Sequence, residues 1–421
     1  MILNFIKKDK VFFNSVFFVV ALFFLSVFLI SLFKIINIWT YSQAHINYFF
    51  GFVQRGLFGT LMIFAKNYLS VNSHYFFSIF FIIIYSLNIL FFFKLIKKYH
   101  SNKLLFSFIA FCPTLMMFSF NDLGGYQRFD SISILLILVH SLICYDFYSN
   151  NITKDVYKKK LLYLIFPLII VSLFIHEIQS WSIFFHFLIS YRILKSDKEF
   201  ILSFSFILLI ILILFLFPFN ENSIYLMKKD LETYKNVYQA ALIGSNTQDN
   251  LNILKYEFQT NFLNFHNFKI NIFFTILGTA PFYLLLLYFR KKKIIQTNFQ
   301  SIDFFISIIP FFSYFFIGDT GRWINIMSFI AIGYLGQFPL NEIEYKKFNK
   351  NFFKKKGLVF FFIFIVILTS FFLRMPHCCN LQKKGIGIHG GVYKKIEAAI
   401  NIFIFRNNDD FYNLNKRFNS N

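Results

Sequence analysis

The stretch FFISIIPFFSYFFIG (Phe304–Gly318), DTGRW (Asp319–Trp323) and INIMSFIAIGYLGQF (Ile324–Phe338) places a charged motif between two apolar runs. An ionised Asp or Arg at the centre of a membrane helix costs roughly 2.5–3.5 kcal/mol and less near the interface. Such residues usually face protein or water and are candidates for function. The stretch therefore predicts two membrane helices joined by a turn that carries an ionised pair.

The composition extends this prediction to the whole chain. Of the 421 residues, 57% are hydrophobic and 15% are charged, and 69 are Phe. A soluble domain has about 25% charged residues. Repeated apolar runs separated by Lys-rich links predict an all-α, polytopic helical bundle, whereas strands of a membrane barrel would alternate.

We predict about eleven transmembrane helices. The apolar runs that define them are Val11–Phe33, Tyr75–Phe93, Leu104–Phe120, Ser131–Tyr148, Leu161–Ile175, Trp181–Tyr191, Phe200–Phe217, Ile270–Phe289, Phe304–Gly318, Ile324–Phe338 and Leu358–Leu373. The segment Lys34–Ser73 is too interrupted by glycine and polar residues to be a clear span, so we expect an interfacial or re-entrant helix.

The short Lys-rich loops set the predicted orientation. With a cytoplasmic N-terminus, uncleaved because its apolar run lacks a signal cleavage site, these loops fall on the inner side. The net charge of +22 then follows from topology, so nucleic-acid binding is not expected. We expect a transmembrane domain over residues 1–373, with an outer loop at 218–269, and an extracytoplasmic tail at 374–421.

Polar clusters gather on the predicted outer side, at or just beyond the ends of spans. They are Arg55; Asp122, Arg128 and Asp130; His176 and Glu177; Asp319 and Arg322; and Arg374 with His377. Helix ends from several segments would converge there on one cavity at the membrane surface.

The arginines are the predicted phosphate ligands. Lys is the commoner base in this chain, and the planar guanidinium binds phosphate with two parallel hydrogen bonds. Alternatives remain open: Arg55 as an interfacial snorkelling residue, Arg128 as the local ion-pair partner of Asp130, and Arg374 as an ordinary basic residue after a last span.

The predicted proton-transfer groups are His176, Glu177 and Asp319. A carboxylate at a low-dielectric boundary has a raised pKa and an imidazole titrates near neutrality, so His176 or Glu177 suits a general base. Both could instead be interfacial polar residues. Asp319 and Arg322 are spaced to pair on one helical turn, as a structural latch or with Asp319 in catalysis.

Several function classes have no sequence support. The chain contains no Walker motif, HExxH, GxSxG or GxGxxG in a usable context. Cys112, Cys144, Cys378 and Cys379 have no zinc spacing and make no disulfide framework. We therefore expect no cofactor and no metal.

At these motifs the chain resembles the O-antigen polymerases (Wzy-type) and the related EpsG-like proteins of bacterial surface-polysaccharide clusters. The likeness lies in the many Phe-, Leu- and Ile-rich spans, the outer loop Pro218–Lys269 and the outer arginine motifs. It implies a glycosyltransferase of the inner membrane that joins undecaprenyl-diphosphate-linked repeat units at the periplasmic face. The implied partners are this lipid-linked glycan, membrane lipid and other polysaccharide-assembly proteins.

On this hypothesis Arg55, Arg128, Arg322 and Arg374 hold the donor diphosphate, and Glu177 or His176 takes the proton of the acceptor hydroxyl. One alternative is a GT-C-type transferase that uses a polyprenyl-phosphate sugar, although Lys34–Ser73 lacks the acidic residue such enzymes place in the first outer loop. Another is a non-catalytic flippase or transporter, for which charges deep within several spans would be expected.

Overall fold

The computed structural model describes residues 2–33, 38–49, 52, 55–121, 126–195, 197–216, 221–231, 255, 259, 265–295, 300–313 and 320–354. The α-helices are α1 Ile2–Phe33, α2 Ile38–Gln43, α3 Gly56–Leu69, α4 Ser73–Ile96, α5 Lys103–Ala110, α6 Met117–Asn121, α7 Asp130–Tyr148, α8 Lys154–Lys160, α9 Phe166–Ile175, α10 Ile183–Leu194, α11 Lys198–Leu216, α12 Glu221–Leu231, α14 Phe265–Lys291, α15 Ser301–Ile308, α17 Thr320–Gly336 and α18 Glu342–Lys354. Short 3₁₀ helices include η4, Glu177–Ser182, and η7, Ile309–Ser313. Within these ranges the prediction of an all-helical chain is confirmed, since the β-structure amounts to one isolated bridge between Ile295 and Leu340.

Three of the described helices are long and apolar enough to cross a membrane: Lys10–Phe33, Ser73–Tyr99 and Asp130–Tyr148. They match the first, second and fourth predicted spans. The number of spans and their orientation stay predictions, and the eleventh span, Leu358–Leu373, lies outside the described residues together with the tail.

The third predicted span, Leu104–Phe120, is not one continuous helix. It consists of α5 and α6, which are separated by turns at residues 111–116. Pro113 explains the break, because proline has no N–H to donate and disfavours helical backbone in the preceding residue. The Asn325 side chain on α17 donates to the carbonyls of Thr114 and Leu115 at 2.8 and 3.0 Å, so the break is satisfied by a neighbouring helix.

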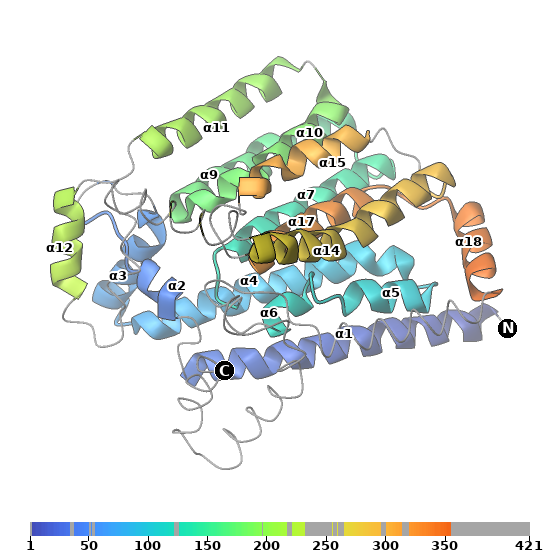
Figure 1. Cartoon of the computed structure of the whole chain (residues 1–421), viewed down its shortest axis with the longest axis horizontal. Helices are drawn as coiled ribbons and strands as arrows, with labels where there is room; N and C mark the ends of the chain where they lie inside the picture. The colour runs from blue at the N-terminus through green and yellow to red at the C-terminus, as the bar shows by residue number, and fades with distance from the viewer. Residues whose placement is uncertain are drawn as a thin grey trace, which may run out of the picture.

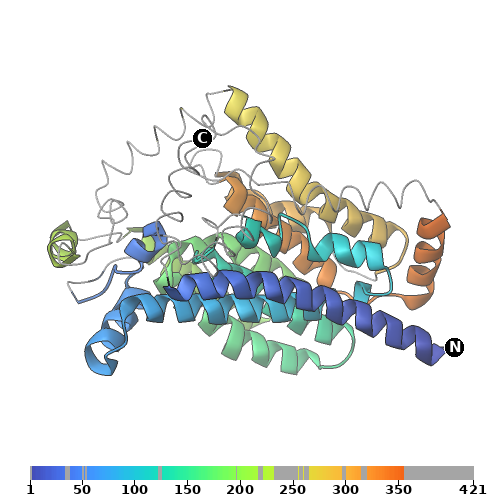
Figure 2. The same cartoon turned by 90° about the horizontal axis from the view of Figure 1, so that it is seen from below.

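The long helices lie roughly side by side and share two common ends (Figures 1 and 2). Helices α2, α3 and α12 lie at one end, which we call the α3 end. The N-terminus and α18 lie at the other, which we call the α18 end. Helix α7 is central, since it packs against α4, α8, α9, α10, α17 and η4.

Phenylalanine fills the spaces between helices. Phe17 on α1 meets Phe93 on α4 edge to face, with ring centroids 5.1 Å apart, and Phe92 meets Phe329 of α17 at 5.8 Å. Edge-to-face pairs of this kind contribute about 0.5–1.5 kcal/mol beyond area burial in water. Buried polar groups also join helices, as where the Asn88 side chain of α4 donates to the Ser131 carbonyl of α7 at 2.9 Å.

Candidate functional site

The centre of the candidate site is an ion pair between the first turns of α7 and α17. Arg322 donates from Nε to Oδ2 of Asp130 at 2.5 Å and from Nη2 to Oδ1 at 2.6 Å. The side chains are only 12% and 7% exposed. This two-bond fork fixes the orientation of the guanidinium as well as its position. Because Asp130 and Arg322 are 192 residues apart, the pair also joins two remote segments.

Two further basic side chains adjoin the pair. Arg128 and His176 both lie close enough to Asp130 for a positive charge on either side chain to act on its carboxylate. The Arg128 carbonyl accepts from the Ser131 hydroxyl at 2.7 Å, which closes the turn before α7. The ring of Phe129 lies 5.7 Å from that of His176, so α7 and the end of α9 meet here.

Gln179 on η4 fixes this arrangement. Its Nε2 donates to the Phe129 carbonyl at 3.0 Å, and its Oε1 accepts from the Ser133 hydroxyl. Gln179 is 1% exposed, so these bonds are made away from water. Buried polar contacts that are fully paired hold neighbouring groups in one geometry.

His176 has a defined acceptor atom. It ends α9 and begins η4, where its Nδ1 accepts a hydrogen bond from the Ile178 amide at 3.2 Å. In the neutral imidazole the proton must then lie on Nε2, which makes that atom a donor. This geometry fits His176 as a hydrogen-bond donor to an anion better than as a proton acceptor.

A wall of aromatic rings adjoins Arg322. The Arg322 guanidinium carbon lies 5.2 Å from the centre of the Trp323 ring system, and Trp323 stacks on Trp181 with centroids 4.4 Å apart. Phe311 packs against Trp181 at 5.8 Å. This cation–π contact adds to the hydrogen bonds that hold the Arg322 guanidinium in place.

Arg55 lies at the same end, immediately before α3. Its backbone is left-handed, with φ of 65°, and its side chain is partly exposed. Phe58, one turn further, packs on Phe129 at 5.3 Å, which brings the start of α3 to the start of α7. Gln127 is also left-handed, with φ of 59°. Strained backbone of this kind in residues other than glycine concentrates at functional sites.

The structure thus brings Arg128, His176 and Arg322 together around Asp130 and places Arg55 at the same end. It describes the backbone of Glu177 at the start of η4, but not its side chain. Asp319, Arg374, Asp122 and His377 lie outside the described residues. The predicted pairing of Arg322 with Asp319 therefore stays a prediction, and among the described residues Arg322 pairs with Asp130 of α7.

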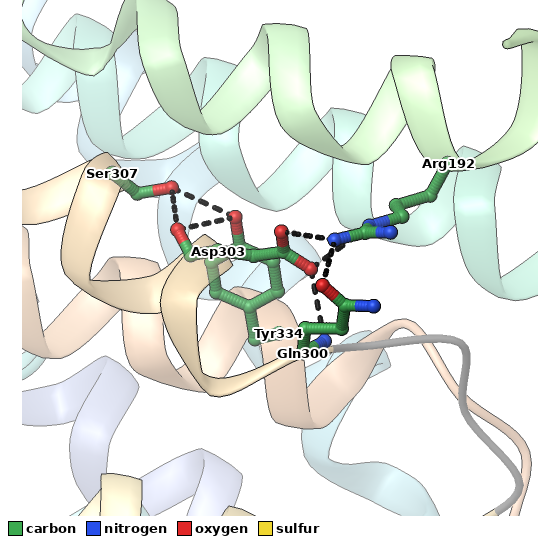
Figure 3. Close-up of polar contacts among 5 residues, drawn as sticks. All are labelled: Arg192, Gln300, Asp303, Ser307 and Tyr334. Atoms are coloured by element: carbon green, nitrogen blue, oxygen red, sulfur yellow. Dashed lines mark hydrogen bonds and ion pairs between the residues drawn. The ribbon is translucent and has the colours of Figure 1, made fainter.

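A second ion pair, between the buried carboxylate of Asp303 and the partly exposed guanidinium of Arg192, lies at the α18 end (Figure 3). Arg192 of α10 donates from Nε and Nη2 to the two carboxylate oxygens of Asp303 at 3.0 and 2.6 Å, and from Nη2 to Gln300 Oε1 at 3.0 Å. The Asp303 carbonyl accepts from the hydroxyls of Ser307 and Tyr334 at 2.8 and 3.3 Å. This network joins α10, α15 and α17.

Two buried histidines, His140 and His186, were not predicted from the sequence as site residues. Nδ1 of His140 on α7 lies 2.9 Å from Nδ1 of His186 on α10, and both residues are fully buried. The available signal was an ionisable residue inside each of two apolar runs, which marks a functional candidate. Among the described residues no group of three or more His, Cys, Asp or Glu could hold a metal ion.

No protein-family model, curated protein or solved structure matches this chain.

Proposed function

We propose that the protein joins lipid-linked oligosaccharide repeat units, in particular the undecaprenyl-diphosphate-linked repeats of an O-antigen or capsule. The reaction would take place at the α3 end, which we assign to the extracytoplasmic side of the bacterial inner membrane. The charge distribution supports this orientation, because the Lys-rich helix α18 and the basic N-terminus lie together at the opposite end.

One observation carries the proposal: a guanidinium oriented by a carboxylate, with further basic groups beside it. Among the described side chains, Arg128 and Arg322 lie near the carboxylate of Asp130, and Arg55 lies at the same end of the bundle. A site of this kind favours an anion with several oxygens. The diphosphate of a lipid-linked sugar is such an anion and lies at the membrane surface, to which we assign these residues.

In the proposed reaction the arginines bind the donor diphosphate and stabilise the charge that develops as the bond to the sugar breaks. His176 adds a donor from Nε2. Glu177 takes the proton from the acceptor hydroxyl, since Nδ1 of His176 is already occupied by the Ile178 amide. The new glycosidic bond forms as the lipid diphosphate leaves.

The test is polymer length in cells. Arg128→Ala and Arg322→Ala should abolish long-chain ladders while the protein remains in the membrane fraction. Arg290→Ala is a matched control, because Arg290 is exposed at the end of α14. Wild-type ladders in both site variants would contradict the proposal.

The lipids of a deletion strain separate the alternatives. Loss of a polymerase leaves single capped repeats, and loss of a single-sugar transferase leaves an incomplete repeat. Loss of a flippase leaves lipid-linked units on the inner face.

One observation favours the transporter alternative as a second candidate. The buried His140–His186 contact places two titratable side chains deep between spans, where groups that move protons are found in pumps and transporters.

A further inference from the structure

The two histidines, which we call the histidine pair, are arranged for an N–H···N hydrogen bond. Their Nδ1 atoms are 2.9 Å apart, their ring planes differ by 7° and their centroids are 5.2 Å apart. A ring nitrogen lies roughly 1.15 Å from the centroid of its ring, and twice this value added to the N–N distance gives the observed separation. The bond therefore lies along the line of the two rings, nearly in their shared plane.

One proton between two Nδ1 atoms allows two neutral arrangements. In the first, His140 donates to His186, so His140 Nε2 is an acceptor and His186 Nε2 carries a proton. In the second, His186 donates to His140, so His140 Nε2 carries a proton and His186 Nε2 is bare. Conversion of one into the other adds a proton at one Nε2 and removes one at the other.

Tyr157 of α8 satisfies both arrangements. Its hydroxyl lies 3.0 Å from His140 Nε2 and 3.3 Å from Ser190 Oγ. Ser190 gives its own proton to the His186 carbonyl at 2.8 Å, so its oxygen is free to accept. Tyr157 can donate to His140 in the first arrangement. In the second it accepts from His140 and donates to Ser190.

The other end of the pair is open. His186 Nε2 is buried and has no hydrogen-bond partner among the described residues in either arrangement. An unpaired buried polar atom costs about 1–3 kcal/mol, so such an atom calls for an explanation. A water molecule or a protonatable group of a ligand would supply the missing partner.

The surroundings keep the pair neutral. Within the described part of the chain the ring nitrogens contact only each other and the hydroxyls of Tyr157 and Ser190, and Cys144 contacts Tyr157 rather than either ring. Phe185 packs on both rings. A lasting net charge on the pair is disfavoured in such an apolar site. When one proton enters as another leaves, the pair stays neutral.

We propose that the histidine pair is a proton relay between Tyr157 and the open Nε2 of His186. Tyr157 passes its hydroxyl proton to His140 Nε2 and regains one from hydronium on the α18 side. The Nδ1 proton of His140 moves to His186, and the Nε2 proton of His186 passes to a water or ligand base. One proton enters and one leaves, so the role is independent of the glycan substrate.

Nitrogen NMR of the full-length protein in lipid, with ¹⁵N-labelled histidine, tests the relay. In the wild type we expect a coupling across the hydrogen bond between the two Nδ1 atoms, and shifts intermediate between protonated and bare nitrogen. His140→Gln and His186→Gln assign the signals by removing them. His100→Gln is the control, because His100 is partly exposed and its described side-chain hydrogen bond, to the Lys97 carbonyl, lies within its own turn.

Tyr157→Phe removes the donor that supports the first arrangement. The two Nδ1 signals should then move apart by most of the protonated-to-bare difference, with His186 protonated at Nδ1. Fixed tautomers in the wild type, no coupling between the rings, or unchanged shifts in Tyr157→Phe would each overturn the relay. The coupling is measured in the wild type, so the test stands even if a variant does not fold.

Discussion

The Asp130–Arg322 and Arg192–Asp303 pairs have the same chemistry at opposite ends of the bundle, but their surroundings differ. Both are two-bond forks between helices. On α17, Arg322 and Tyr334, which bonds to Asp303, are separated by about 18 Å along the helix axis. At the α18 end Gln300 accepts from Arg192, and the hydroxyls of Ser307 and Tyr334 donate to the backbone carbonyl of Asp303.

The pair at the α3 end instead has basic neighbours, Arg128 and His176, and an aromatic wall. A network of donors matched to acceptors holds helices together, whereas an ion pair with added basic groups retains attraction for an anion. The charges around the ion pair, more than the pair itself, therefore distinguish a candidate anion-binding site from a structural latch between helices.

Replacing each pair by apolar residues should give the largest difference. Breaking one partner of a buried pair destabilises by about 3–5 kcal/mol, but replacing both is often neutral. Arg192→Met with Asp303→Leu should keep polymer ladders near the wild-type level. Arg322→Met with Asp130→Leu should keep the protein folded and reduce polymer at least a hundredfold. Equal ladders from both double variants would remove the distinction between site and latch.

The packing around two glycines, Gly59 and Gly336, also differs between the two ends of the bundle. A Cβ on Gly59 of α3 would lie 2.0 Å from the Ile46 carbonyl oxygen, which belongs to the backbone. A Cβ on Gly336 of α17 would lie 2.5 Å from Leu95 Cγ, in a side chain that can rotate. Gly59→Ala should therefore lower the free energy of unfolding by about 2–3 kcal/mol and Gly336→Ala by about 1 kcal/mol. Thermal unfolding in detergent measures both, and the reverse order would contradict this account.

Lysine substitutions probe the fork itself. A lysine ammonium keeps the charge but cannot make the two parallel bonds of a guanidinium. Arg322→Lys should reduce polymer about tenfold, because the diphosphate also needs the planar donor. Arg192→Lys should leave polymer within twofold of the wild type. Ladder intensity normalised to protein level reports both variants, and full activity in Arg322→Lys would count against phosphate binding there.

Mild acid should destabilise the α3 end more than the α18 end, and this is the smallest of the expected effects. Burial, with a smaller contribution from the charge of Lys66, lowers the pKa of His45, which lies before α3, from 6.5 to about 4. The unfolded chain binds a proton at His45 more readily than the folded protein does. The contribution of His45 to the free energy of unfolding is therefore fully present above pH 6.5 and falls as the pH drops toward 4. The loss at pH 5.5 is about 1 kcal/mol.

At the α18 end the Lys158 ammonium lowers the pKa of Asp197 below 3.8. That contact is lost only as the pH falls below this value, so pH 5.5 leaves it intact. Unfolding of the wild type and of His45→Gln, compared at pH 7 and pH 5.5, measures the difference. An equal loss in both proteins would assign the acid sensitivity elsewhere.

The sequence anticipated the helices better than their contacts. The runs Val11–Phe33, Tyr75–Phe93 and Ser131–Tyr148 each correspond to a membrane-length helix, because a long apolar run has few other ways to satisfy its backbone. Leu104–Phe120 has a similar average hydrophobicity but is interrupted at Pro113. Hydrophobicity does not report a local break that Asn325, more than two hundred residues away, can satisfy.

For the candidate site, the charged residues at the ends of apolar runs could be recognised from the sequence. A charge costs less there than at the centre of a membrane helix, so its position along the run is informative. The folded chain adds contacts that the sequence did not predict: Arg322 pairs with Asp130, the Ile178 amide donates to Nδ1 of His176, and His140 meets His186. These contacts join separate helices or depend on the backbone at a helix end. Their energies come from desolvation and geometry across a packed interface, which spacing along one chain does not specify.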